Sequence, residues 1–262
     1  MVSKVLAIAN QKGGVGKTTT SVNLAASLKI TRKNVLLIDL DPQGNATMGS
    51  GIDKNALEKS VYDLLVQEAG FDEVVVRPEE AGYDLLPANG DLVAAEVDLI
   101  IGENRETRLR QIVVAIKQRY DFVVIDCPPS LNMLTINALA AADGVVIPMQ
   151  CEYYALEGLS ALMDTISTIK DRLNPELKIE GILRTMYDPR NKLTTEVNGQ
   201  LFNYFGDAVY RTVVPRNVRL AEAPSYGKPA IKYDKRSRGA IAYLALAGEM
   251  LRRHDEAAAG IS

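Results

Sequence analysis

The sequence contains little cysteine and no long hydrophobic run, and each absence narrows what the chain can be. Its 262 residues include two cysteines, Cys127 and Cys151, too few for a disulfide framework or a cysteine metal set. Each follows an apolar run, so we expect both as buried small side chains in a reducing cytosol. No apolar stretch is long enough to cross a bilayer. No hydrophobic segment of a signal peptide precedes Lys12. We therefore expect a soluble, cytoplasmic protein.

Internal repeats, low-complexity tracts and linker-like stretches are also missing from the sequence. Apolar residues make up 47% of the chain and charged residues 24%, which is typical of a packed globular protein rather than a disordered one. The net charge of −3 gives no overall indication of a nucleic-acid partner. We expect residues 1–262 to form a single domain.

Short apolar runs alternate with segments of helical periodicity. The apolar runs do not alternate with polar residues, so both of their faces are expected to be buried, as in a parallel sheet covered by helices. These runs are 5–9, 35–38, 122–125, 145–147 and 179–183. The helical segments are 57–67, 105–119, 131–142, 156–173, 196–205 and 240–253. This order predicts a doubly wound α/β fold with a mostly parallel sheet flanked by helices, and ligands at the carboxyl ends of the strands.

Residues 49–108 mix polar and apolar side chains without a clean period. Within them, 84–87 is expected to form a short strand and 91–99 a short helix.

A glycine-rich stretch follows the first apolar run. Residues 9–20 read Ala-Asn-Gln-Lys-Gly-Gly-Val-Gly-Lys-Thr-Thr-Thr and lead into a helix-forming segment. Strand, glycine loop and helix together are the context of a phosphate-binding loop, in which backbone N–H groups and a helix N-terminus converge on an anion. In this pattern Lys17 reaches the β- and γ-phosphates, and the Thr18 hydroxyl binds Mg²⁺. The alternative, a glycine turn with two solvated lysines, is disfavoured by this context.

Acidic residues follow two of the predicted strands. Asp39 and Asp41 come after run 35–38, and Asp126 comes after run 122–125. Each lies at the carboxyl edge of the sheet, where the glycine loop also lies, as expected of carboxylates that hold Mg²⁺ or its waters. A helix N-cap would explain any one of these acids. It explains three of them less readily.

The first glycine of the usual phosphate-loop pattern is absent, and Gln11 stands in its place. The loop 12–18 reads Lys-Gly-Gly-Val-Gly-Lys-Thr, with a second lysine at its start. This deviant Walker A string resembles that of the ParA/MinD group of P-loop ATPases. The strings at 150–158 and 215–225 resemble the ParA/Soj branch, and the likeness runs nearly from end to end.

This resemblance implies a slow, partner-stimulated ATPase of P-loop NTPase fold, with ATP and Mg²⁺ as cofactors and an ATP-dependent homodimer. It assigns catalytic roles to Lys12, Lys17 and Asp41, with Lys12 reaching the partner subunit's phosphates. Thr18, Asp39 and Asp126 would hold the metal. Segments 41–45 and 126–129 would be switches that respond to the γ-phosphate. The residues that would bind the nucleotide are Lys12, Gly13, Gly14, Val15, Gly16, Lys17, Thr18, Thr19, Pro215 and Asn217.

Basic residues gather between positions 184 and 238. This stretch has eleven lysines and arginines and five acids, a net charge of +6 in a chain of −3. Such segregation is typical of a protein that binds a polyanion, although an ordinary solvated basic face explains it as well. No base-reading element accompanies the stretch, so binding to phosphates should be independent of sequence and sensitive to salt.

The resemblance favours the polyanion. It implies that the ATP dimer binds nonspecific double-stranded DNA, that the protein is nucleoid-associated, and that a ParB-type partner stimulates hydrolysis and release. Arginines matching Arg190 and Arg219 lie on the DNA face in that branch. We predict that further residues of the stretch join them: Lys228, Lys232, Arg236 and Arg238.

Two other classes remain open. A MinD-like membrane-bound ATPase would need a basic amphipathic C-terminal helix. We interpret Ile241, Leu244 and Leu251 of segment 240–253 as a core-packing stripe, so no membrane partner is expected. A relative of the nitrogenase iron protein would need cysteines that bridge a cluster between subunits, and Cys127 is a poor candidate.

One position departs from the family pattern. The family usually ends its first helix with a glycine, but residues 31–34 read Thr-Arg-Lys-Asn. Because Thr31 does not readily adopt the left-handed conformation, we expect Asn34 to adopt it one turn later.

Overall fold

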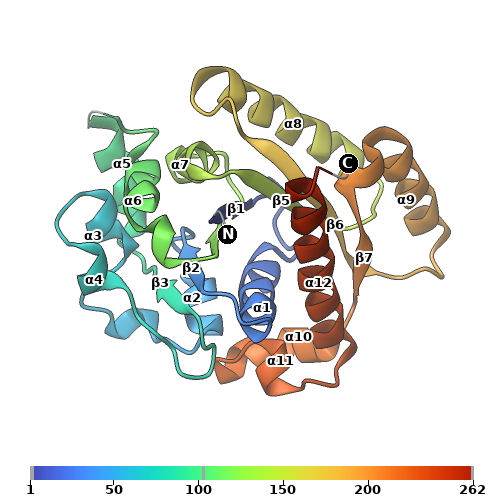
Figure 1. Cartoon of the computed structure of the whole chain (residues 1–262), viewed down its shortest axis with the longest axis horizontal. Coiled ribbons are helices and arrows are strands. Elements are labelled where there is room, and N and C mark those ends of the chain that lie inside the picture. Colours follow the sequence, from blue (N-terminus) through green and yellow to red (C-terminus); the bar gives the residue numbers. More distant parts are fainter. Residues whose placement is uncertain (1–2, 102–103, 261–262) are drawn as a thin grey trace.

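The computed structural model describes residues 3–101 and 104–260. Its centre is a seven-stranded sheet of order β3-β2-β4-β1-β5-β6-β7, in which all neighbouring strands run parallel (Figure 1). The predicted fold class is confirmed. The strands are β1 (Lys4–Ile8), β2 (Val35–Asp39), β3 (Asp84–Leu86), β4 (Phe122–Asp126), β5 (Gly144–Met149), β6 (Lys178–Tyr187) and β7 (Val209–Pro215).

Helices cover both faces of this sheet (Figure 1). One layer holds α3 (Val61–Leu65), α5 (Leu92–Ile101), α6 (Arg108–Ile116), α7 (Met133–Ala141), α8 (Ala155–Arg172) and α9 (Lys192–Phe205). The other holds α1 (Lys17–Ile30), α2 (Asn45–Gly49), α10 (Val218–Glu222), α11 (Ala230–Tyr233) and α12 (Arg238–Ala258). The short helix α4 (Phe71–Val74) lies beside α3 at the β3 edge.

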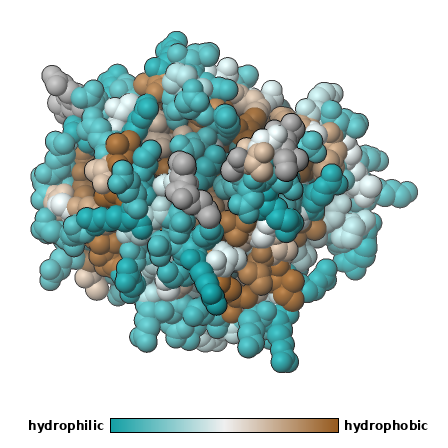
Figure 2. All heavy atoms as spheres, in the orientation of Figure 1, coloured by the Kyte–Doolittle hydropathy of each residue, from teal (hydrophilic) through white to brown (hydrophobic). Residues whose placement is uncertain are grey.

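The sheet separates two hydrophobic cores, which explains the non-alternating apolar runs. Along β2, Leu36 and Ile38 pack into one core while Val35 and Leu37 pack into the other. Every residue of a central strand therefore removes apolar surface from water, at roughly 25 cal/mol per Å². Figure 2 shows the outer surface on one side of the molecule, covered mainly by hydrophilic side chains with apolar areas between them.

Several element bounds differ from the expectation. The helix expected over 57–67 is shortened to α3, because the Ser60 hydroxyl accepts from the Tyr62 N–H and caps the helix there. Helix α9 begins at residue 192 rather than at 196, because the Asn191 side chain accepts from the Leu193 N–H and caps the helix there. The strand β7 was not predicted, since its sequence mixes buried and exposed residues at the edge of the sheet.

The end of α1 also differs from the expectation. Arg32 has a φ of 65°, and it is this residue, not Asn34, that adopts the left-handed conformation. Its N–H donates to the Lys29 carbonyl at 3.0 Å, and the Lys33 N–H donates to the Leu28 carbonyl at 3.3 Å. These two bonds make a Schellman motif, so a non-glycine residue is held in the strained position by the hydrogen bonds around it.

The apolar stripe expected on the last helix was wrong at two of its three residues. Ile241 and Leu244 are 54% and 37% exposed. The buried side of α12 carries Tyr243, Leu246 and Met250, which follow helical spacing and pack against the α1 layer. Ile241 and Leu244 are thus two positions away from the buried Tyr243 and Leu246, whereas the third predicted residue, Leu251, is partly buried and packs against the core as expected.

Two glycines bring distant segments into backbone contact. Gly51, just beyond α2, has a φ of 93°, and a Cβ atom there would lie 2.8 Å from the Gly227 carbonyl oxygen. Gly227 precedes α11, and a Cβ atom on it would lie 2.7 Å from the Gly51 Cα. Neither position has room for a side chain.

Candidate active site

The loop between β1 and α1 lies at the carboxyl edge of the sheet. Gly14 and Gly16 have φ values of 73° and 87°, left-handed conformations that glycine adopts readily. A Cβ atom at Gly13 or Gly14 would meet nothing within 4 Å. The loop is therefore open on this side, and an anion can approach its backbone and the N-terminus of α1.

Side chains from the ends of β5 and β6 fix the loop from outside. The Thr185 hydroxyl donates to the Val15 carbonyl at 2.8 Å, and the Gln150 amide donates to the Gly14 carbonyl at 3.1 Å. Sequence reasoning missed both as site residues. Gln150 opens one of the strings that carry the resemblance, but Thr185 lies inside a buried strand, where nothing in the sequence marks it.

Lys17 points back into the loop. Its residue is 7% exposed, and its ammonium donates to the Lys12 carbonyl at 3.1 Å. Burial lowers the pKa of Lys17, whereas the nearby acidic groups of Asp126 and Asp41 oppose that change. The ammonium thus lies beside the acids that the sequence predicts at the site.

Asp126, at the end of β4, has an unpaired carboxylate oxygen. Its Oδ1 accepts from the Ser21 hydroxyl at 2.7 Å, while its Oδ2 is buried and has no hydrogen-bond partner within residues 3–101 and 104–260. Burial and the neighbouring charge of Asp39 raise the pKa of Asp126, and the nearby hydroxyls of Ser21 and Thr18 oppose that rise. A buried, unpaired carboxylate oxygen beside the Thr18 side chain fits a magnesium site.

Ser21 is a second residue that sequence reasoning missed. It follows Lys17 by four positions on α1, so both side chains lie on one face of the helix. This spacing is the signal that could have marked it.

Asp39 and Asp41 lie on the other side of this cluster. Asp39 is fully buried, and both of its oxygens accept hydrogen bonds: from the Thr47 N–H and hydroxyl at 2.8 Å each, and from the Asp41 N–H at 3.1 Å. Burial raises the pKa of Asp39. Asp41 is 8% exposed and accepts from the Gln43 N–H at 2.9 Å. In register, Asp39 pairs with Asp126 across β2 and β4, so the three acids are neighbours.

Lys12 extends away from this cluster. Its ammonium lies 2.6 Å from the Glu152 carboxylate, and both side chains are about half exposed, at 45% and 50%. The two lysines of the loop therefore have different surroundings: Lys17 is enclosed by its own subunit, and Lys12 lies on the surface.

A cavity of about 200 Å³ adjoins the loop. Gly16 and Thr19 line one side, and Pro215 and Asn217 line another, so residues far apart in sequence meet here. Apolar side chains dominate its wall, and the buried Oδ1 of Asn217 has no hydrogen-bond partner in the part of the chain that the structure describes. An apolar slot with one polar amide fits a flat heteroaromatic ring.

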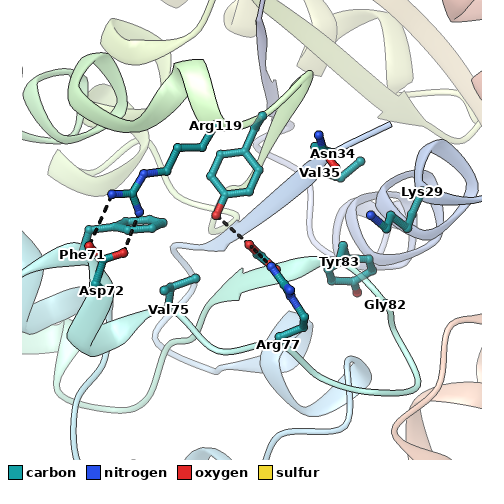
Figure 3. A pocket seen from close by; sticks show the side chains of 12 residues that line it. Lys29, Asn34, Val35, Phe71, Asp72, Val75, Arg77, Gly82, Tyr83 and Arg119 are labelled. Carbon is teal, nitrogen blue, oxygen red and sulfur yellow. Dashed lines mark hydrogen bonds and ion pairs between the residues drawn. The ribbon is translucent and has the colours of Figure 1, made fainter. Parts of the chain in front are cut away.

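A larger cavity of about 660 Å³ lies at the opposite edge of the sheet, near the amino ends of β2 and β3 (Figure 3). Its arginines are paired: Arg77 with Asp84 and Arg119 with Asp72, each at 2.6 Å. Tyr120 also donates to Asp84, at 2.8 Å. Because an anion would have to displace these carboxylates, and no residue of the loop lines the cavity, it is separate from the candidate active site.

Six basic residues that are predicted to bind DNA lie between the end of β6 and the start of α12. We call this set the basic arc: Arg190, Arg219, Lys228, Lys232, Arg236 and Arg238. Three members pair with acids of the same chain at 2.7 to 2.9 Å: Arg190 with Asp188, Arg219 with Glu222, and Lys228 with Glu80. The arc is therefore partly neutralised within the chain.

Arg184 was counted with this basic stretch and does not belong to the surface. It is 4% exposed, and its guanidinium donates to the Asn198 side chain and to the Arg211 carbonyl, the latter at 3.0 Å. It also lies over the Phe202 ring. Arg184 is a structural tie between β6, β7 and α9.

Comparison with known proteins decides the family. The family model described as "AAA domain" matches residues 3–179. The chain is 55% identical to the sporulation initiation inhibitor protein Soj of Bacillus subtilis over 249 residues, covering 95% of this chain and 98% of Soj. It is 51% identical to the chromosome partitioning protein ParA of Myxococcus xanthus, covering 96% and 89%. The chain belongs to the ParA/Soj family of partitioning ATPases.

A solved structure agrees with this ParA/Soj-family fold. The crystal structure of cobyrinic acid a,c-diamide synthase from Mycobacterium smegmatis, with a bound ATP analogue and magnesium, is 38% identical. It covers 98% of this chain and 97% of that one, with a TM-score of 0.86.

The sequence left two alternatives open, a membrane-bound ATPase and a relative of the nitrogenase iron protein, and both can be compared with this ParA/Soj-family structure. Among the described residues, no helix has the length and apolar character needed to span a membrane. Within the same ranges, neither cysteine belongs to a group of three or more histidine, cysteine or acidic side chains that could hold a metal cluster. Cys127 and Cys151 are both buried, as expected. Burial raises the pKa of the Cys151 thiol to about 11, so it is a poor source of thiolate.

Proposed function

We propose that the loop binds ATP with Mg²⁺. Lys17 and the backbone of residues 12–19 would hold the phosphates, and Pro215 and Asn217 would contact the base in the 200 Å³ cavity. Thr18 and Asp126 would contact the metal and its waters, with Asp39 behind them, since Mg²⁺ usually keeps several waters and few protein ligands. The ion would neutralise charge on the phosphates. Support comes from the open loop, the unpaired Asp126 oxygen and the nucleotide-bound relative.

Hydrolysis would require groups from two subunits. We assign Asp41 to orient the attacking water, because it is the acid of the cluster nearest solvent, at 8% exposure against full burial of the other two. Lys12 would neutralise charge that develops on the partner's phosphates. The observation that carries the proposal is the different surroundings of the two loop lysines, since Lys12 is free to cross to a second subunit.

The ATP-bound homodimer would bind nonspecific double-stranded DNA through the basic arc. A dimer presents every member of the arc twice, so phosphate neutralisation and counterion release would both double. A ParB-type partner would stimulate hydrolysis, which returns the protein to a monomer that releases DNA. The protein would act in the cytoplasm, on the nucleoid, as a single-domain partitioning ATPase.

The family members favour this function over that of the cobyrinic acid a,c-diamide synthase. Identity to the partitioning proteins is 51–55%, against 38% to the synthase, over similar shares of the chain. We therefore do not propose amidation chemistry.

The test is DNA retention by the purified protein with ATP, ADP or no nucleotide, each at low and at moderate salt. We expect DNA to be retained only in the presence of ATP and Mg²⁺. Retention should not depend on the DNA sequence and should be lost as salt rises. Equal retention in all three nucleotide states would contradict the proposal, as would salt-resistant binding.

A further inference from the structure

A third cavity, of about 490 Å³, lies where β6 and β7 end and α12 begins. Its wall holds three arginines, Arg190, Arg216 and Arg238, and one acid, Asp188. Arginine guanidinium groups match the oxygens of a phosphate in pairs, so three of them around one hollow suit a phosphodiester.

Arg216 was not among the predicted DNA residues, yet it is unengaged. It and Arg238 are exposed, and within residues 3–101 and 104–260 neither forms an ion pair. Arg190 instead pairs with Asp188 through two hydrogen bonds, at 2.9 and 2.7 Å. The charge of Arg216 also reaches Asp188, whose pKa falls to about 2, chiefly because of the hydrogen bonds from Arg190. The cavity thus has an excess of two positive charges.

This arginine cavity shares a wall with the proposed base cavity. Pro215 and Arg216 line both hollows, and Asn217 follows them in the base cavity. On the facing strand, Met186 lines the base cavity and Tyr187 lines the arginine cavity. The strands meet here, because Tyr187 pairs with Pro215 in register. A ring held against Pro215 therefore fixes the backbone that carries the Arg216 guanidinium.

We infer that the cavity of Arg190, Arg216 and Arg238 binds a backbone phosphate of DNA, and that residues 215–217 couple this site to the nucleotide base. The inference rests on the proposed function and extends it to a specific phosphate pocket. Occupation of the base cavity orders Arg216, so nucleotide raises DNA affinity. By linkage, DNA then raises nucleotide affinity by the same factor.

The experiment compares wild type, Arg216→Ala, Arg216→Lys and a control, Arg172→Ala. Arg172 is an exposed arginine at the end of α8. Helix α8 lies far from α10 and α11 (Figure 1). Binding of a fluorescent duplex DNA is measured with a nonhydrolysable ATP analogue over a series of salt concentrations. Dissociation of a fluorescent nucleotide is measured with and without unlabelled DNA. A further arm replaces DNA with inorganic phosphate.

For Arg216→Ala we expect DNA affinity to fall roughly tenfold or more. The slope of log affinity against log salt should become shallower by about 2, since a dimer loses two phosphate contacts of about 0.9 each. DNA should no longer slow nucleotide dissociation in this variant. Arg216→Lys should restore the salt slope because it keeps the charge, and Arg172→Ala should match wild type. Inorganic phosphate should not reproduce the effect of DNA on nucleotide.

The outcomes separate this inference from the proposed function. If the wild-type protein binds no DNA in the presence of the ATP analogue, the proposed function itself is contradicted. If wild type binds DNA and Arg216→Ala keeps its affinity, salt slope and coupling, the pocket assignment is overturned. An Arg216→Lys variant with the shallow slope of Arg216→Ala would overturn it too, because charge would not be what Arg216 supplies. Slower nucleotide dissociation with phosphate alone would identify a free-anion site instead.

Discussion

Lys12 and Glu152 form an ion pair 2.6 Å long that holds the loop's first lysine on the surface of its own subunit. Both side chains are about half exposed, and such pairs contribute about 0–1 kcal/mol to stability. Dimerisation can therefore break the pair at little cost.

Lys12→Ala should bind nucleotide as a monomer but neither dimerise nor hydrolyse ATP. The reason is that, in the proposed function, Lys12 would act on the partner's phosphates and not on its own. Size-exclusion chromatography with ATP and magnesium, together with phosphate release, measures both properties. Glu152→Gln is the matched control: it removes the other half of the ion pair and should still dimerise. A stable Lys12→Ala dimer with full turnover would show that Lys12 has no such role.

Lys17→Ala and Thr18→Ala should each weaken ATP binding by at least about 100-fold, because the buried Lys17 would meet the phosphates and the partly buried Thr18 would meet the metal. Equilibrium binding of a fluorescent ATP analogue measures the loss. Lys29→Ala, at the far end of the same helix, should bind as wild type does. A Lys17→Ala variant that binds the ATP analogue with near-normal affinity would contradict the assignment of this loop as a phosphate-binding loop.

Asp41→Ala should keep nucleotide binding and lose hydrolysis, since it deletes the carboxylate proposed to orient water and leaves Asp126 in place. The variant should accumulate as an ATP dimer that stays on DNA. Single-turnover hydrolysis and DNA retention over time report the two effects. If Asp41→Ala hydrolyses ATP while Asp39→Ala does not, the roles of the two acids are reversed.

Arg219→Glu should eliminate DNA binding on any sequence while ATP binding and dimerisation persist, and Arg190→Glu should weaken it. Because Arg219 lies 2.7 Å from Glu222 and 3.5 Å from Asp234, the new carboxylate would also repel its neighbours. Arg219→Ala is therefore tested alongside. Electrophoretic retardation on two unrelated duplexes measures the loss. Wild-type affinity in both variants, or a loss confined to one duplex, would contradict a nonspecific DNA face.

Glu249→Gln should destabilise the fold by roughly 1–3 kcal/mol at pH 7. Glu249 is buried on α12 and accepts from the N–H groups of Arg211 and Thr212, which ties β7 to the helix. Burial opposes its ionisation, but the hydrogen bonds from Thr212 and Arg211 and the charge of Arg253 lower the pKa of Glu249.

The sign of its pH dependence follows from that direction. A carboxylate with a lowered folded pKa stabilises the protein above its unfolded pKa of about 4.3, and this contribution is lost as pH falls through the folded value. The difference between wild type and Glu249→Gln should therefore shrink below about pH 4. Urea unfolding at several pH values tests this. A difference that stays constant from pH 7 down to about pH 3 would show that ionisation of Glu249 does not matter.

The fold was predictable because its strands are buried on both faces. An apolar run such as 122–125 has one explanation in a soluble chain with alternating helices, and the acid at its end then falls at the carboxyl edge. β7 escaped prediction because an edge strand is buried unevenly: Val209 and Tyr210 are buried, whereas Arg211 is exposed. The offset on α12 has the same origin, since Tyr243 counts as polar in a pattern of aliphatic residues but is buried in the structure.

The loop and its acids could be named from local spacing, and their roles stay predictions. What spacing does not contain is contact between distant segments. Thr185 on β6 hydrogen-bonds to Val15 across β5, and Arg216 and Arg238 line one cavity. Such contacts depend on the order of the strands in the sheet, which was not predicted from the sequence.

Gly51 and Gly227 touch backbone to backbone, and this contact has a mechanical consequence. Gly51 ends the short segment that begins at Asp41, whereas Gly227 precedes the Lys228 and Lys232 part of the basic arc. No side chain lies between the two glycines to absorb a displacement by changing rotamer. A shift of residues 41–51 would therefore be passed directly to the segment that carries these lysines. The contact between Gly51 and Gly227 is stiff because neither residue has a side chain.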